Sequence, residues 1–319
     1  MPDFVISVRN VKKDGTFGTE PGPTKFLKVP SNQLPRPSHD VSRDEWVQDV
    51  MKEAANGTDP VTDNPRGDIL IFIHGYNNDA SAVMWRHRRL RKDLREKKYE
   101  GAVVAFDWPS NDVGINYLED RSDARQTSIR LVDDGIRLFA VTQQNGCDIN
   151  VHLLAHSTGA YVIREAFDDA DDRRGIAATN WSVSQIMFIG ADVSSKSMSE
   201  HDSKSSSIYR HCVRLTNYQN PYDSVLKLSN IKRVGVAPRV GRIGLPESVP
   251  QKAVNVNCGP FFSKLKKGKK RVSHIGAWDH SWHIGNGRFA KDLAATIKGD
   301  IDRHYIPTRR DVNGDLQLA

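Results

Sequence analysis

The sequence predicts an α/β protein built on a doubly wound, mostly parallel sheet. From residue 68 onward, short apolar or β-branched runs alternate with amphipathic helical patterns. Most of these runs are continuously apolar, which is typical of strands covered on both faces, and strand–helix alternation favours parallel pairing. A length of 319 residues, 38% of them hydrophobic, is enough to form one large core.

Segment 1–65 is expected to complete this sheet rather than to form a domain of its own. Its residue pattern predicts short strands at 4–11 and 24–29, separated by a stretch rich in proline and glycine. A helix follows at 42–54, with Ser42 as its N-cap.

The core is expected within residues 66–305, followed by a C-terminal tail at 306–319. Apolar runs in this core predict strands at 68–75, 101–108, 149–156, 183–190, 212–218 and 253–258. Apolar residues repeat with helical spacing at 80–94, 129–139, 159–167 and 288–299. With segment 1–65 packed against this core, we expect one domain in all.

Composition argues against several other classes of protein. No apolar run approaches the ~18 residues of a transmembrane helix, and the N-terminus lacks the basic start and long apolar segment of a secretory signal. The cysteines, Cys147, Cys212 and Cys258, are far apart and match neither a metal site nor a disulfide framework. These observations favour a cytoplasmic location.

Much of the net charge of +7 comes from two basic segments. Residues 85–98 contain eight Lys and Arg on an amphipathic helix with interspersed acids, so a solvated helix face is favoured. Residues 264–271 contain six in a predicted loop, which either attracts acidic substrates or is simply flexible and soluble. Aromatic residues are not interleaved as in a single-strand binder, so we do not expect nucleic-acid binding.

One apolar run is interrupted by polar residues where a strand should pass into a helix. INVHLLAH predicts the strand and GAYVIREAF the helix, so Ser157 falls on the turn between them. In a parallel sheet this turn lies at the carboxyl edge, where ligands bind. Ala155 and Gly159 flank the serine as in a nucleophile elbow, with alanine replacing the usual first glycine. A Ser/Thr N-cap is the alternative interpretation.

A glycine after an earlier strand provides a second feature. His74-Gly75 ends the run LIFIHG, and a glycine there lets the backbone turn so that the next N–H faces a substrate oxyanion. Together with the residue after the nucleophile, this nominates the backbone N–H groups of Tyr76 and Thr158 as an oxyanion hole. An ordinary loop start is the alternative.

An acid is needed to orient a catalytic histidine, and two aspartates follow later strands. Asp223 comes just beyond the strand at 212–218, in a loop opened by Asn-Pro. It is equally placed to cap the following helix. Asp192, in FIGADVSS, is the rival, and we favour Asp223.

The order Ser, Asp, His along the chain requires a histidine beyond Asp223. The candidates are His274, His280, His283 and His304. We favour His280, which lies in a polar loop just before the C-terminal helix, then His283, then His274, whereas His304 has the surroundings of a surface residue. A metal site at Asp279, His280 and His283 is disfavoured, because neither a helical His-Glu-x-x-His nor a cysteine pair accompanies it.

Together these stretches resemble the α/β-hydrolase superfamily and, more narrowly, the bacterial α/β hydrolases grouped as DUF900. The matching segments are IFIHGYNND, FDWPS, NYLEDRSDARQTS, VHLLAHSTGAYVIREA, IMFIGADV, SVLKLS and DHSWHI. The resemblance implies a mainly parallel sheet of about eight strands, with Ser157 as nucleophile, Asp223 as acid and His280 as base. Ala155 and the long basic loop at 259–278 depart from the pattern.

The expected activity is hydrolysis of small-molecule carboxylic esters through an acyl-enzyme, without cofactor or metal. An amidase, thioesterase or acyltransferase would use the same triad, and a non-catalytic binding module is a further alternative. Segments 111–125 and 193–211 are lid candidates. Neither acyl preference nor oligomeric state follows from these residues. The candidates for lining the substrate pocket are His74, Gly75, Tyr76, Asn77, Asn78, Trp108, Tyr117, Trp278 and Trp282.

Overall fold

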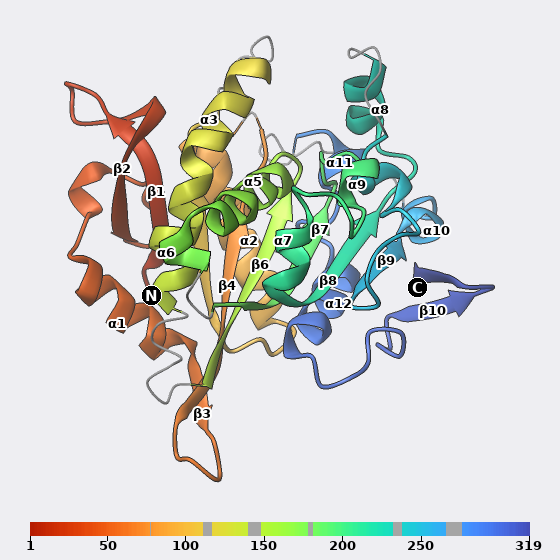
Figure 1. Cartoon of the computed structure of the whole chain (residues 1–319). Helices are drawn as coiled ribbons and strands as arrows, with labels where there is room; N and C mark the ends of the chain where they lie inside the picture. The colour runs from red at the N-terminus through yellow and green to blue at the C-terminus, as the bar shows by residue number, and fades with distance from the viewer. Residues whose placement is uncertain (77, 111–116, 140–147, 178–180, 232–237, 266–275) are drawn as a thin grey trace.

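The computed structural model describes the chain except for residues 77, 111–116, 140–147, 178–180, 232–237 and 266–275. Its described strands form one mostly parallel sheet with helices on both faces, as predicted (Figure 1). The parallel strands at its centre are β4 (Pro65–Ile73), β5 (Ala102–Asp107), β6 (Asp148–His156), β7 (Val183–Ile189), β8 (Cys212–Gln219) and β9 (Ala253–Asn257).

Both ends of the chain extend this sheet. β1 (Asp3–Val11) pairs in parallel with β5, and β2 (Phe17–Val29) returns antiparallel to it. At the other end, β10 (Arg309–Val312) and β11 (Asp315–Leu318) form a hairpin that joins β9. Figure 1 shows the two terminal segments at opposite ends of the sheet.

The sheet has 11 strands among the described residues, in the order β10-β11-β9-β8-β7-β6-β4-β5-β1-β2 with β3 (Ala55–Thr58) paired to β4. The family resemblance implied about eight strands. The strands β3, β10 and β11 are short and largely polar, so no apolar run in the sequence marks them. The tail expected at 306–319 thus contributes a hairpin to the sheet.

Helices cover both faces and follow most of the strands. The longer ones are α1 (Arg43–Ala54), α2 (Ala80–Arg95), α3 (Tyr117–Arg130) with the π-helical η2 (Leu131–Ile136), α5 (Gly159–Asp172), α8 (Ser224–Ile231) and α12 (Gly287–Lys298). Short turns are η1 (Pro37–His39), α6 (Arg174–Ala177), η3 (Lys196–Met198), α7 (Ser206–Arg210), α9 (Val240–Ile243), α10 (Gly259–Phe262) and α11 (Trp278–Ser281). No described helix is long and apolar enough to cross a bilayer.

Alternate residues of the strands pack into two separate hydrophobic cores, one on each face of the sheet. Along β4, Ile71 and Ile73 face a cluster that includes residues of α1, η2 and α5, whereas Leu70 and Phe72 face α2 and α12. This alternation follows from the strand period of two, and it explains why the central runs are apolar throughout. Ser42 accepts the Glu45 N–H at 3.3 Å, which confirms the predicted start of α1.

A buried ion pair fastens the C-terminal hairpin to α12. Arg309 at the start of β10 donates to both carboxylate oxygens of Asp292, at 2.6 and 2.9 Å. Tyr218 of β8 and Thr308 donate to the same carboxylate at 2.6 and 2.5 Å. Asp292 has no exposed surface, so its charge depends on these donors.

We expect Arg309→Leu to lower the free energy of unfolding by about 3–5 kcal/mol, because the change leaves the buried Asp292 carboxylate without its cationic partner. The neighbouring Arg310 is exposed, and Arg310→Leu is the matched control, with an expected change within about 0.5 kcal/mol. Urea unfolding of both variants measures the difference. Equal losses would contradict the anchoring role of Arg309.

Candidate active site

Ser157 occupies a sharp turn between β6 and α5. Its φ of 56° lies in the left-handed region, which residues with a side chain rarely adopt. The Ser157 N–H donates to Ile189 O at 3.1 Å, and its carbonyl accepts the Asp192 N–H at 3.0 Å. The end of β7 therefore holds the strained residue from both sides, at the carboxyl edge of the sheet.

The end of β4 packs directly against this turn. A Cβ added at Gly159 would lie 2.5 Å from the Ile73 carbonyl oxygen, and one at Gly75 would lie 2.6 Å from the Ser157 Cβ. Neither position accepts a side chain without movement of the backbone. Gly159, one of the two small residues that suggested an elbow, and Gly75 are therefore required by close backbone contact.

Asp223 and His280 form a buried hydrogen-bonded pair. The distance from His280 Nδ1 to Asp223 Oδ2 is 2.7 Å, and the second carboxylate oxygen accepts the Leu226 N–H at 2.9 Å. Asp223 thus caps α8 and orients the imidazole at the same time. Since an ionised carboxylate can only accept, His280 donates from Nδ1 and keeps the lone pair on Nε2.

The structure brings His280 to the same strand end as Ser157. Gly190 follows β7 directly, and a Cβ built there would lie 3.1 Å from His280 Nδ1. The imidazole of His156, which precedes Ser157, lies 4.8 Å from the His280 ring. Asp223, which follows β8, and His280, in the short helix α11, therefore lie at the same edge of the sheet as Ser157.

The rival candidates have other partners. Asp192 is buried and forms an ion pair with Arg239, with 2.9 Å between Oδ1 and Nε. His283 is buried between the rings of Trp282 and Phe289, at centroid distances of 4.2 and 5.1 Å. Burial, followed by the charge of His280, holds the pKa of His283 well below its usual value.

The remaining alternatives are His304, His274 and Asp279. His304 is exposed beside Asp302, and His274 lies outside the described residues. Asp279 accepts the Ser224 N–H at 2.8 Å, which joins the histidine loop to α8. Within the described part of the chain, no cluster of three or more His, Cys, Asp or Glu side chains is arranged to hold a metal ion.

Asn78 fixes the orientation of the proposed oxyanion donor. Its Nδ2 donates to the carbonyls of Gly75 at 2.7 Å and Tyr76 at 2.8 Å, and His74 Nδ1 lies 2.8 Å from the same Gly75 oxygen. The Gly75 carbonyl and the Tyr76 N–H belong to one planar trans peptide and point in opposite directions. Holding the carbonyl therefore directs the N–H away from Asn78.

His74 and Trp108 support this turn from within the core. Trp108 donates its backbone N–H to His74 Nε2 at 3.2 Å and its indole N–H to the His74 carbonyl at 2.9 Å, and the two rings stack. Burial lowers the pKa of His74, which favours its neutral form. Neither side chain has more than 1% exposed surface, so both hold the turn rather than line an open pocket.

The other predicted pocket residues differ in exposure. Tyr76 and Trp278 are half-buried, whereas Trp282 is buried in the core shared with α12. Asn77 and the Tyr117 side chain lie outside the described residues. The lid candidate 193–211 packs into the core through Met198, Ile208 and Tyr209.

His156 forms a bridge that the sequence motifs do not reveal. Its Nδ1 lies 3.0 Å from Arg86 Nη1 on α2, and its Nε2 lies 3.3 Å from the His280 carbonyl and 3.2 Å from Ser281 Oγ. Arginine can only donate, so His156 accepts at Nδ1 and carries its proton on Nε2. Burial, reinforced by Arg86, holds the pKa of His156 well below its usual value.

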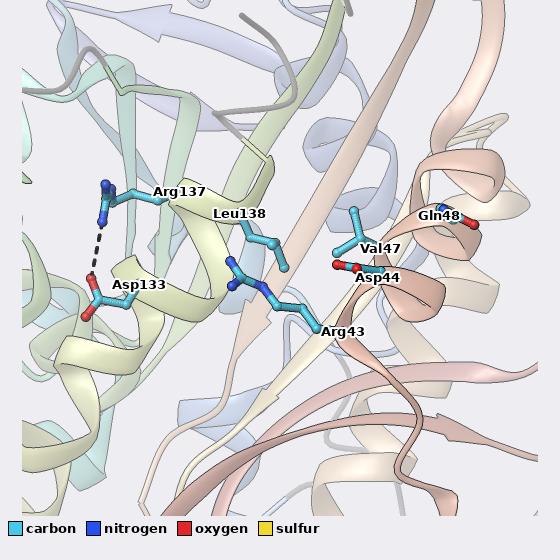
Figure 2. A pocket seen from close by; sticks show the side chains of 7 residues that line it. All are labelled: Arg43, Asp44, Val47, Gln48, Asp133, Arg137 and Leu138. Carbon is cyan, nitrogen blue, oxygen red and sulfur yellow. Dashed lines mark ion pairs between the residues drawn. The ribbon is translucent and has the colours of Figure 1, made fainter. Parts of the chain in front are cut away.

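A cavity of about 470 Å³ lies elsewhere, between α1 and η2 (Figure 2). Asp133 and Arg137 form an ion pair at 3.8 Å on its wall. None of its lining residues belongs to the site at Ser157. The lining residues are Arg43, Asp44, Val47, Gln48, Asp133, Arg137 and Leu138.

Comparisons with known proteins identify a family for most of the chain. A family model described as "Alpha/beta hydrolase of unknown function (DUF900)" matches residues 51–283. A solved cutinase-like protein from Cryptococcus sp. is 11% identical with a TM-score of 0.34, over 77% of this chain and 98% of that one. A metagenomic carboxyl esterase is 8% identical with a TM-score of 0.34, over 77% and 78% of the two chains. A search of curated proteins finds no match.

We expect Gly75→Ala to lower the free energy of unfolding by about 1–3 kcal/mol, because its new methyl group would overlap Ser157. Gly175→Ala is the control, since a Cβ at Gly175 would meet nothing within 4 Å. Chemical unfolding of both variants gives the comparison. If Gly75→Ala were as stable as the wild type, the close approach of β4 to the elbow would be wrong.

Proposed function

The chain belongs to the DUF900 family of α/β hydrolases, and from this premise we propose that it is a serine hydrolase that cleaves carboxylic esters. The observation that carries the proposal is the buried contact of 2.7 Å between Asp223 and His280, beside a serine held at φ 56°. A strained serine, an imidazole and an orienting carboxylate are the components of nucleophilic acyl transfer.

Acylation starts with proton transfer from Ser157 Oγ to His280 Nε2 as the oxygen attacks the ester carbon. Asp223 holds the ring in the tautomer whose Nε2 is free to accept, and its buried charge stabilises the imidazolium that forms. The backbone N–H groups of Tyr76 and Thr158 bind the oxyanion. Collapse of the tetrahedral intermediate breaks the ester C–O bond, and His280 returns the proton to the departing alcohol.

Deacylation repeats the same steps with water. His280 takes a proton from the attacking water, the second tetrahedral intermediate collapses, and Ser157 leaves with that proton. The carboxylic acid is released and the enzyme returns to its starting state. The residues named here account for every proton transfer in the cycle.

Aromatic side chains around the acid and the base favour a substrate with an apolar acyl group. Tyr222, next to Asp223, is 54% exposed and stacks on Phe262, with 5.9 Å between the ring centroids. The Phe262 ring also packs near that of Trp278, with 6.4 Å between the ring centroids. Trp278 comes two residues before His280. An aromatic cluster at this position, with Tyr222 exposed and the other two rings half-buried, supports small or medium acyl esters as substrates.

Ser157→Ala should abolish turnover of p-nitrophenyl esters and covalent labelling by a fluorophosphonate, because the attacking oxygen is gone. Intact mass and peptide mapping of the wild type should locate one adduct on Ser157. Ser184 lies on β7 and bonds Asn150 at 2.8 Å, and Ser184→Ala is the control, with full activity expected. Unchanged ester turnover in Ser157→Ala would refute the proposal.

Asp223→Asn should reduce kcat about 10⁴-fold, because an amide donor facing Nδ1 forces the proton onto Nε2. The amide oxygen can still cap α8, so the variant should remain folded. Asp192→Asn should instead lower stability, since it weakens a buried pair with Arg239, while kcat per folded molecule stays near that of the wild type. If the two effects were exchanged, Asp192 would be the acid of the triad.

A further inference from the structure

The N-terminal strand reaches the proposed oxyanion turn from outside the region that the family model covers. That model matches residues 51–283, whereas β1 begins at Asp3 and pairs with β5. Arg9, near the end of β1, is 4% exposed and lies beside Asp107 at the end of β5. The carboxyl ends of β1, β4 and β5 are adjacent, because all three strands are parallel neighbours.

Arg9 joins two parts of this edge through separate nitrogens. Its Nε donates to Asp107 Oδ1 at 2.8 Å, and its Nη2 donates to the Asn78 carbonyl at 3.2 Å. Ser110 Oγ also donates to that carbonyl, at 3.2 Å, and lies 3.2 Å from the Asn78 N–H. Arg9 and Ser110 therefore hold the backbone of Asn78, while the Asn78 side chain contacts the turn.

Asn78 transmits this restraint to the oxyanion donor. Its side chain holds the Gly75 carbonyl at 2.7 Å, which sets the direction of the Tyr76 N–H in the same peptide. A shift of the Asn78 backbone would move that side chain and rotate the peptide plane. Only the transition state carries a full oxyanion, so such a rotation would affect kcat more than KM.

We propose that Arg9 is a positioning residue for the oxyanion turn, which it acts on through Asn78. The inference rests on the proposed ester hydrolysis at Ser157. Arg9 touches neither the nucleophile nor the acid–base pair. Its effect on the reaction passes through two hydrogen bonds and one peptide plane.

The positive charge of Arg9 is paired with a buried carboxylate, that of Asp107. Burial alone would raise the pKa of Asp107, but Arg9 and then His74 outweigh it and lower that pKa to about 2. Arg9 is the larger of these two lowering influences. The forked guanidinium satisfies the carboxylate and the Asn78 carbonyl together, which a single ammonium group cannot reproduce in the same geometry.

The test uses the full chain and the change Arg9→Lys, which keeps the charge but removes the fork. We expect kcat for a p-nitrophenyl ester to fall about tenfold, a fraction of the loss when an oxyanion donor is removed outright. KM should stay within about twofold, and the rate of fluorophosphonate labelling at Ser157 should fall in parallel with kcat.

Arg91→Lys provides the matched control. Arg91, on α2, pairs at 2.8 Å with Asp3, at the opposite end of β1 from Arg9, so the same chemical change is made in an ion pair with β1 away from the turn. We expect its kcat to equal that of the wild type. Arg9→Lys with unchanged kcat, or equal losses in both variants, would overturn the role of Arg9. A wild-type protein without ester turnover or adduct would overturn the proposed function itself.

Discussion

The site depends on one close contact between backbones, where the end of β4 meets the turn at Ser157. Gly75 and Gly159 allow this approach, and a methyl group at either position would overlap atoms of the opposite segment. The contact places the turn after β4 beside the serine, and the end of β7 holds that serine from the other side. The remaining groups are then added around a fixed centre by neighbouring parallel strands.

Three histidines near this centre have different roles because their surroundings differ. Burial lowers the pKa values of His74 and His156, and both ring nitrogens of each have hydrogen-bonding partners. The Nδ1 of His280 instead lies 2.7 Å from the Asp223 carboxylate. A nearby carboxylate alone does not identify the base, because Asp107 lies 3.4 Å from His74 Nε2. The contacts of both ring nitrogens distinguish the two structural imidazoles, and residue type alone cannot make that distinction.

Local sequence patterns predicted the central strands, the start of α1 and the convergence of the turns after β4, β6 and β8, because each depends on a short segment. They did not predict the contacts of Arg9 with Asn78 or of His156 with Arg86, since these join segments about 70 residues apart whose meeting depends on the completed sheet. The hairpin of β10 and β11 was missed for a related reason. Its strands are short, and a buried ion pair rather than an apolar run secures it.

The terminal strands have a consequence for how the protein can be handled as a smaller piece. Cutting the chain to residues 51–283 would remove β1, which pairs with β5, and β11, which pairs with β9. β5 and β9 would then present unpaired N–H and C=O groups to water, and unprotected edges of this kind promote intermolecular β-pairing. The shortest soluble fragment should therefore be longer than the segment matched by the family model, because the flanks outside that segment cover the edges of β5 and β9.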